Sequence, residues 1–423
     1  MLRTLKSSLY FFVAGYFKFF AAIQLGIWKP KVVVITGSNG KTTALHLIEA
    51  QLQSKARYSH HANSAYGIPF DILGLQRVTF ARSEWLKIFW LAPIRAFKKP
   101  YPETLYVVEA DCDRPREGLF LSSLLRPAVT IWLSSARTHS QNFDRLVSSG
   151  TFSLVDEAIA HEFGYFVEKA QELVIFNADN SLIKKQLKRS QARQQAIKES
   201  DLSDYQVTLH RSHFTIGNQM VSLHYLLPQE TFYALAATHH LLQFLGQPLD
   251  PNFTKLQLPP GRSSILNGIK NTTIIDSSYN ANLASTAAIL TMVSKLASPK
   301  KWLILGDLIE QGQEEGEEHE KLADLVATQE FAAIILVGPR LTEYTYPLLR
   351  THNEKAGNLL AFINPAEALH YLEKNLQGGE ILVFKGARFL EGIIEHLLED
   401  QKDVAKLCRR EPIWQQRRRQ WGL

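Results

Sequence analysis

The sequence predicts an α/β protein in which a first domain with a mainly parallel sheet is followed by a second α/β domain. Short β-branched runs alternate with helical patterns along the chain, as in doubly wound parallel sheets. The alternation stops at LPPGR (258–262) and then restarts, which marks a domain boundary. A chain of 423 residues is also too long for one core, and 45% hydrophobic with 21% charged residues excludes whole-chain disorder, collagen and coiled coil.

Residues 1–30 form an apolar N-terminal segment in which a helix is expected. Two placements stay open: a helix packed on the folded body, or a helix in the membrane interface that brings residues 1–28 to the inner face of the membrane. A spanning helix is disfavoured because Lys18 would lie near the bilayer centre. A signal peptide is disfavoured because Lys18 interrupts the apolar run and no small-residue cleavage site follows it.

The first domain is expected to span residues 31–261. Its predicted strands are Lys31–Thr36, Leu105–Glu109, Val129–Leu133 and Leu173–Asn177, with helices between them, including Val155–Gln171. Residues 182–204 are polar and charge-mixed, which predicts an exposed helix and loop. Residues 205–228 predict a small antiparallel insertion, and a helix over Thr231–Leu245 follows.

The second domain is expected over residues 262–400. Its predicted strands are Thr273–Asp276, Trp302–Leu305, Ala333–Val337 and Glu380–Phe384, and the acidic run 314–320 is expected to be a solvated helix start. Residues 401–423 form a basic, Trp-bearing tail, interpreted as a solvated helix face or a membrane-surface contact.

Charge and cysteine content narrow the class of protein. The net charge of +6 is mild for this length, so no nucleic-acid partner is expected. The two cysteines, Cys112 and Cys408, cannot build a disulfide scaffold or a four-Cys zinc ribbon. They fit a reducing compartment, and a cytoplasmic location is therefore predicted.

The first predicted strand runs into TGSNGKTT (36–43) and then into a helix, which is the arrangement of a phosphate loop. Gly37 and Gly40 allow a tight turn whose N–H groups point at phosphate oxygens, Lys41 would reach the β- and γ-phosphates, and Thr42 would give its hydroxyl to Mg²⁺. The residues expected to bind ATP here are Gly37, Ser38, Asn39, Gly40, Lys41, Thr42 and Thr43. Ile35 stands where a standard P-loop has its first glycine, so the loop is a shortened variant.

Further segments follow the loop in an order and spacing that extend over residues 31–390. They are NSAYGIP (63–69), VVEADCDRP (107–115), LLRPAVTIW (124–132) with His139, PPGRSSIL (259–266), IIDSSYNANLAS (274–285), LGDLIEQG (305–312) with His319, and VFKGAR (383–388). Together with TGSNGKTT they resemble the motifs of the Mur ligases, which join amino acids or dipeptides to a growing peptidoglycan precursor. The Tyr-Asn-Ala-Asn segment and LGDLIEQG are most similar to the branch that adds D-alanyl-D-alanine.

The resemblance implies a central P-loop ATPase domain, a C-terminal Rossmann-like α/β domain, and ATP-dependent amide-bond formation through an acyl phosphate. Glu109 ends a predicted strand at the carboxyl edge of the sheet, where a carboxylate can hold Mg²⁺. By resemblance, His139 would hold a second Mg²⁺, Arg262 would offset charge on the transferring phosphate, and Asp276 and Asn280 would face the nucleotide. The substrate-binding set would be Asn63, Ser64, Lys385 and Arg388, although Lys385 would serve a phosphate equally well.

Three features of this chain depart from the family. There is no room for the N-terminal domain that holds UDP, so the substrate is either held differently or is lipid-linked, which would fit the apolar N-terminal segment. Phe163 stands where most members carry a carbamylated lysine, so either Glu162 or His161 serves the second metal, or that metal is weakly held. Tyr233 replaces an adenine-facing asparagine and could stack on adenine instead.

The leading hypothesis is therefore a ligase of peptidoglycan precursor assembly, using ATP and Mg²⁺. Its substrates would be a small-molecule or lipid-linked muramyl peptide and an amino acid or dipeptide. One alternative is the synthetase subunit of an amidotransferase like lipid II isoglutaminyl synthase, disfavoured because that family carries a four-Cys zinc ribbon. The other is a non-catalytic, membrane-associated scaffold, which Phe163 favours. The retained set disfavours it, namely Lys41, Thr42, Glu109, His139 and Arg262.

Overall fold

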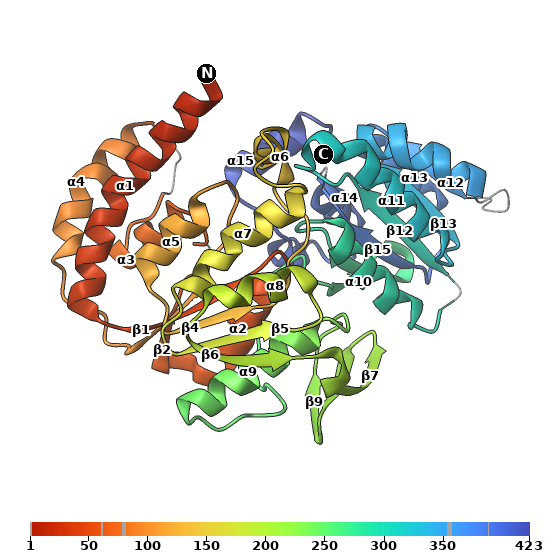
Figure 1. Cartoon of the computed structure of the whole chain (residues 1–423). Coiled ribbons are helices and arrows are strands. Elements are labelled where there is room, and N and C mark those ends of the chain that lie inside the picture. The colour runs from red at the N-terminus through yellow and green to blue at the C-terminus, as the bar shows by residue number, and fades with distance from the viewer. Residues whose placement is uncertain (1, 61, 78–81, 299, 353–357, 388) are drawn as a thin grey trace. The chain divides into compact units, whose positions relative to one another are not determined.

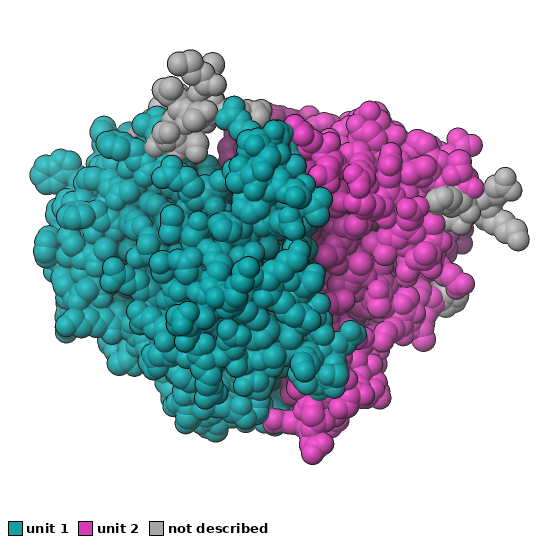
Figure 2. All heavy atoms as spheres, viewed as in Figure 1, with its two compact units in different colours: residues 1–201, 233–256 teal, residues 202–232, 257–423 magenta. Residues whose placement is uncertain are grey.

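The computed structural model describes residues 2–60, 62–77, 82–298, 300–352, 358–387 and 389–423. The chain forms two compact units, coloured separately in Figure 2. Unit 1 contains residues 1–201 and 233–256, and unit 2 contains residues 202–232 and 257–423.

The sheet of unit 1 has six parallel strands in the order β2-β3-β1-β4-β5-β6. They are β1 (Lys31–Thr36), β2 (Ala56–Tyr58), β3 (Leu105–Glu109), β4 (Val129–Trp132), β5 (Leu173–Asn177) and β6 (Arg193–Ile197). The four central strands are the predicted ones, because their side chains are largely buried on both faces and therefore apolar. The prediction for 182–204 was wrong in part: β6 is a strand, but as an exposed edge its sequence RQQAI carries no apolar signal.

Nine helices are described in unit 1 (Figure 1): α1 (Leu2–Trp28), α2 (Lys41–Leu52), α3 (Gly67–Leu73), α4 (Arg82–Ala96), α5 (Glu117–Leu125), α6 (Asp144–Ser148), α7 (Val155–Glu168), α8 (Ser181–Gln186) and α9 (Thr231–Leu245). One face of α1 is packed on the folded body, because Ala14, Phe17 and Ala21 are fully buried in the core of the unit. Within the described residues, the stretch Leu9–Trp28 of α1 is the one helix whose length and apolar composition would suffice to cross a membrane.

Unit 2 contains a mixed six-stranded sheet in the order β10-β11-β15-β12-β13-β14, in which only the β10–β11 pair is antiparallel. Its strands are β10 (Ser264–Gly268), β11 (Thr272–Ser277), β12 (Lys301–Gly306), β13 (Ala333–Val337), β14 (Leu359–Phe362) and β15 (Ile381–Lys385). Its helices are α10 (Leu283–Ser294), α11 (Glu315–Ala327), α12 (Tyr346–His352), α13 (Pro365–Asn375), α14 (Leu390–Leu397) and α15 (Pro412–Arg419). The expected antiparallel insertion is confirmed as β7 (Leu202–Thr208), β8 (Arg211–Ile216) and β9 (Gln219–Leu223).

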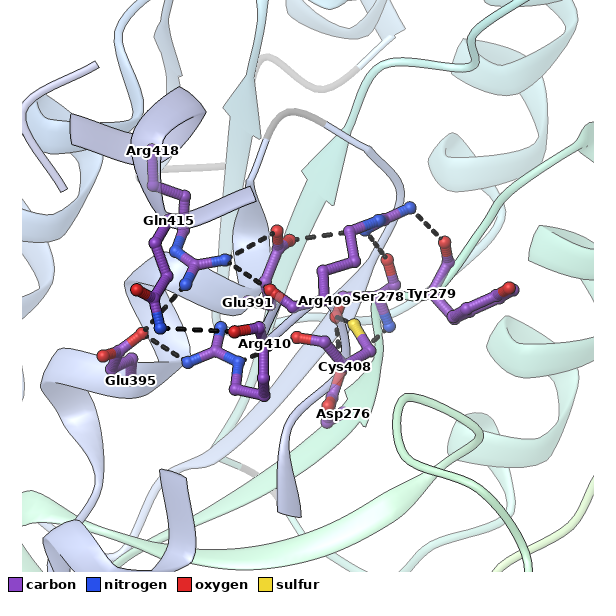
Figure 3. Close-up of polar contacts among 10 residues, drawn as sticks. All are labelled: Asp276, Ser278, Tyr279, Glu391, Glu395, Cys408, Arg409, Arg410, Gln415 and Arg418. Carbon is purple, nitrogen blue, oxygen red and sulfur yellow. Dashed lines mark hydrogen bonds and ion pairs between the residues drawn. The ribbon is translucent and has the colours of Figure 1, made fainter. Parts of the chain in front are cut away.

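The basic tail is solvated in part, as its sequence predicted: Arg417 and Arg419 of α15 are exposed, but other arginines of the tail are buried or paired. Arg418 of α15 is buried with its guanidinium 3.6 Å from the fully buried carboxylate of Glu391, as Figure 3 shows. Arg409 also pairs with Glu391 and donates to the carbonyl of Ser278 at 3.3 Å, and Arg410 lies 2.6 Å from Glu395. Because these arginines balance carboxylates of α14, the tail is an integral part of unit 2.

Candidate functional site

The phosphate loop connects β1 to α2 in unit 1 and needs both of its glycines. Gly37 has φ +122°, and a Cβ there would lie 2.5 Å from the carbonyl oxygen of Ser134. Gly40 has φ +84° and precedes α2 without supplying a side-chain cap. The first-turn N–H groups of α2 therefore have no capping side chain, and with the helix dipole they form an anion-binding end.

The loop is held in shape by residues that follow β4. The Ser38 N–H donates to the carbonyl of Ser134 at 3.1 Å, and the Ser38 hydroxyl donates to the carbonyl of Ala136 at 2.5 Å. The Asn39 N–H donates to the Ser134 hydroxyl at 2.8 Å, which in turn donates to the Asn39 carbonyl at 3.0 Å. These contacts fix the loop geometry before any ligand binds.

The ammonium of Lys41 is buried and paired. Its Nζ donates to the carbonyl of Gly37 at 2.5 Å and lies 2.8 Å from Oδ2 of Asp111. Burial alone would lower the pKa of Lys41, but the carboxylates of Asp111 and Glu109 more than offset it, and the pKa is raised. The side chain is therefore a fixed positive charge beside the loop.

Thr42 and Glu109, the two residues predicted to bind the first Mg²⁺, are brought together. The Thr42 hydroxyl donates to Oε2 of Glu109 at 2.8 Å. A hydroxyl and a carboxylate at the carboxyl end of β3 are the oxygen donors that Mg²⁺ prefers, so this pair fits the ion.

Two carboxylates that sequence reasoning missed lie beside His139, the residue predicted to hold the second Mg²⁺. Ligand atoms of Asp111, Asp113 and His139 all lie within 4.8 Å of one another, and the His139 ring Nε2 is 3.2 Å from Oδ1 of Asp113. The pKa of Asp113 is raised by burial and then by the charge of Asp111. The sequence ADCD (110–113) carried a signal for this group. Alternate residues of an extended segment point to the same side, so Asp111 and Asp113 can be expected to lie together after the buried strand β3.

The two residues considered as substitutes for a carbamylated lysine have other partners. Both oxygens of the buried Glu162 carboxylate accept N–H groups at the start of α5, from Arg116 at 2.7 Å and Gly118 at 3.0 Å. His161 contacts Tyr165 and Arg189 on another side of α7. Phe163 is fully buried in the core against Trp132. Glu162 thus caps the start of α5, and the metal role considered for Glu162 or His161 stays a prediction.

Glu117 connects residues 111–113, called the acidic segment below, to the loop that carries Asn63 and Ser64. Its Oε1 accepts the N–H of Ala65 at 2.8 Å, and its Oε2 accepts the N–H of Asp113 at 3.1 Å. Burial, followed by the charge of Asp113, raises the pKa of Glu117 to about 7. The carbonyl of Asn63 accepts the N–H of Asp111 at 2.8 Å, and the Ser64 hydroxyl accepts the N–H of Gly67 at 3.2 Å.

Unit 2 carries the other predicted site residues. Lys385, at the end of β15, donates to the carbonyl of Asn280 at 2.6 Å, and burial together with the charge of Arg262 lowers the pKa of Lys385 to about 7. The guanidinium carbon of Arg262 lies 5.0 Å from the centre of the Tyr279 ring. Arg388 lies outside the described residues.

Asp276 is fully buried, and its Oδ1 accepts the N–H and the hydroxyl of Ser278 at 3.0 and 2.6 Å. Its second oxygen has no hydrogen-bond partner among the residues that the structure describes. Asp276 therefore shapes the turn before Asn280 rather than presenting a carboxylate to solvent.

Comparisons with known proteins point to one family. Residues 261–388 match the family model described as Mur ligase, glutamate ligase domain. The UDP-N-acetylmuramoyl-tripeptide–D-alanyl-D-alanine ligase of Borreliella burgdorferi is 24% identical over 85% of this chain and 72% of its own length. The enzyme of the same name from Escherichia coli is 24% identical over 73% of this chain and 64% of its own length.

Solved structures show the same fold. MurF ligase from Thermotoga maritima, crystallised with ADP, superposes with a TM-score of 0.71 at 20% identity and covers 93% of this chain and 84% of that one. Folylpolyglutamate synthase from Mycobacterium tuberculosis superposes with a TM-score of 0.57 at 13% identity over 89% and 94% of the two chains. The predicted α/β fold, with a parallel and a mixed sheet, is confirmed.

Proposed function

We propose that the chain, which is similar to Mur ligases of the MurF type, is an ATP-dependent ligase of peptidoglycan precursor synthesis. It would join a carboxylate of a muramyl peptide to the amine of an amino acid or dipeptide. The observation that carries the proposal is the braced phosphate loop, in which Lys41 is charged and Thr42 contacts Glu109.

The proposed reaction has two steps. The substrate carboxylate oxygen attacks the γ-phosphorus of ATP, and ADP leaves with the electron pair of the broken P–O bond. The amine then attacks the acyl carbon, forming the amide, losing a proton and releasing inorganic phosphate. Catalysis of such transfers is mainly positioning and charge stabilisation.

In unit 1, the contacts of several predicted residues support a role for each. The N–H groups at the start of α2 and the ammonium of Lys41 would hold the phosphates, and Thr42 and Glu109 would hold Mg²⁺, which offsets phosphate charge when bound. Asp113 and His139 would hold a second cation near the acyl phosphate. The role of Arg262 in stabilising the transferring phosphate rests on the resemblance to the Mur ligases.

The proposal is tested by phosphate release from MgATP with a panel of acid and amine substrates. The panel would contain UDP-linked and lipid-linked muramyl peptides as acids, and amino acids, D-alanyl-D-alanine and ammonia as amines. We expect release that requires one acid–amine pair, and its loss in Lys41→Ala but not in the exposed control Lys184→Ala. ATP binding without turnover for every pair would contradict the proposal, and turnover with ammonia alone would favour an amidotransferase synthetase.

A further inference from the structure

The outer surface of α1 is apolar throughout the part whose side chains are described. The exposed residues between positions 9 and 28 are Leu9, Phe12, Phe19, Ala22, Gly26 and Ile27. A helix that packs on a soluble body normally carries polar residues on its outer face. α1 has apolar side chains both toward the core and away from it.

A second apolar stripe lies on the neighbouring helix α4 and was not anticipated from sequence. Leu86, Trp90 and Ile94 recur every fourth residue, Phe97 follows the helix end, and their exposed fractions are 74, 77, 58 and 69%. Positions at this spacing share one helix face. Large side chains gathered in this way mark an interaction surface, whereas single exposed apolar residues do not.

The two helices are held side by side by their inner faces (Figure 1). The Tyr16 hydroxyl donates to the carbonyl of Phe89 at 2.8 Å, and the rings of Phe17 and Phe89 are 4.9 Å apart. Ile88 and Ala92 of α4 are buried in the same core as Phe17. The exposed stripes are therefore outer faces of well-packed helices.

Charge indicates what covers these faces. Residues 1–30 and 74–102 together contain ten Lys and Arg and a single acidic residue, Glu84, a net charge of +9. Because the whole chain is +6, the remaining residues are net negative, and the positive charge is concentrated on the two segments that carry the apolar stripes. Apolar side chains flanked by basic ones are complementary to an anionic phospholipid surface.

We propose that α1 and α4 together form a docking face that inserts into the interfacial region of an anionic phospholipid bilayer. The helices lie on the membrane and do not span it, because the inner side of α1 is buried in the core of unit 1. The exposed aromatic side chains and the basic residues beside them would sit at the headgroup level.

The docking face is directly connected to the candidate site. The Tyr10 hydroxyl of α1 contacts Oε1 of Glu117 at 3.2 Å, and the Tyr66 hydroxyl donates to the carbonyl of Tyr10 at 2.8 Å. The start of α1 therefore borders the 63–66 loop and the acidic segment. We infer that the acid substrate is a lipid-linked muramyl peptide, an inference that rests on the proposed function, whereas the docking itself does not.

Vesicle binding by the full-length protein tests the docking without nucleotide or substrate. Vesicles containing phosphatidylglycerol should bind the protein and phosphatidylcholine vesicles should bind it weakly, with the difference reduced by salt. The combined variant Leu86→Ser/Trp90→Ser/Ile94→Ser should bind at least about tenfold more weakly. A matched variant at exposed apolar residues elsewhere, Leu154→Ser/Met220→Ser/Ile363→Ser, should bind like the wild type, and both variants should keep the wild-type unfolding midpoint.

Three outcomes would overturn the docking proposal. One is vesicle binding as strong as that of the wild type by the combined variant Leu86→Ser/Trp90→Ser/Ile94→Ser, called the α4 variant below. Another is a dimer that sediments without lipid and dissociates in the α4 variant, which would assign the face to a second copy. The third is retention in the membrane after alkaline carbonate extraction, which would indicate a spanning α1.

The substrate is tested separately. The α4 variant should lose turnover of a vesicle-embedded muramyl peptide but still use the same peptide dispersed in detergent. Exclusive use of a UDP-linked peptide would refute the lipid-linked substrate and leave the docking proposal standing.

Discussion

The ion pair between Lys41 and Asp111 gives the sharpest test of how the phosphate loop is held. The two charged atoms are 2.8 Å apart, and the side chains are 7 and 10% exposed. Asp111→Asn keeps the shape of the side chain and the oxygen that accepts the Cys112 N–H at 2.9 Å. The substitution removes the partner charge while leaving a buried ammonium, and removing one member of a buried pair costs about 3–5 kcal/mol.

For a domain of this size, such a loss lowers the unfolding midpoint by about 6–20 °C, which thermal unfolding by circular dichroism would measure. The matched variant Lys41→Met/Asp111→Asn removes both charges and should recover most of the lost stability, because an uncharged pair needs no partner. Destabilisation below about 1 kcal/mol in the single variant, or a double variant as unstable as the sum of its single changes, would refute the reasoning.

Three further predictions concern pH, backbone and the tail. The pKa of Glu117 is about 7 in the folded chain against 4.5 in the unfolded chain, so the folded protein holds the proton more tightly. About 3 kcal/mol of the unfolding free energy should therefore be lost as pH rises from about 4.5 to 7. Urea unfolding at several pH values should show this loss in the wild type and a much flatter pH dependence in Glu117→Gln. Gly37→Ala should abolish ATP binding in calorimetry, because φ is +122° and the new Cβ would meet a carbonyl at 2.5 Å; binding within threefold of wild type would contradict this. Arg409→Gln should lower the unfolding free energy by about 3 kcal/mol, because it removes one of the charges that neutralise the buried Glu391. Arg419 is exposed, so Arg419→Gln is the control and should have no effect. Equal effects of the two substitutions would show that the tail is not an integral part of unit 2.

The sequence predicted the fold where one physical signal dominates. Buried parallel strands such as β1 and β13 are apolar along their whole length, so KVVVIT and AIILV were sufficient to find them. Of the strands that were missed, β2 has only three residues, and β14 (LLAF) is apolar but has only four residues, so its run cannot be told from part of a helix. The tail was misjudged in part because its arginines read as solvated charge, whereas Arg409 and Arg410 pair with carboxylates of α14 that lie 18 and 15 residues earlier in the chain, a separation that local patterns do not relate.

The candidate site was predictable to a similar degree. The contact between Thr42 and Glu109 follows from motif order and sheet topology, because Glu109 ends β3 and Thr42 lies in the first turn of the helix that follows the adjacent parallel strand β1. The burial of Lys41 against Asp111 and the capping role of Glu162 could not be foreseen, since they depend on side-chain directions that spacing does not determine. Asp276 illustrates the same limit, because a polar residue at a strand end can turn inward to shape a loop.

The structure of α7 bears on how a second cation could be held. Gly118 lies so close to α7 that a Cβ at this position would be 2.0 Å from the carbonyl oxygen of Glu162. The Glu162 carboxylate accepts the N–H of Gly118 and so caps the start of α5. With Phe163 in the core, the side chains at positions 162 and 163 serve the α5–α7 contact. In our proposal, a second cation would be held instead by the group of Asp111, Asp113 and His139. Because Asp111 also pairs with Lys41, cation binding there and phosphate binding at the loop would share one carboxylate.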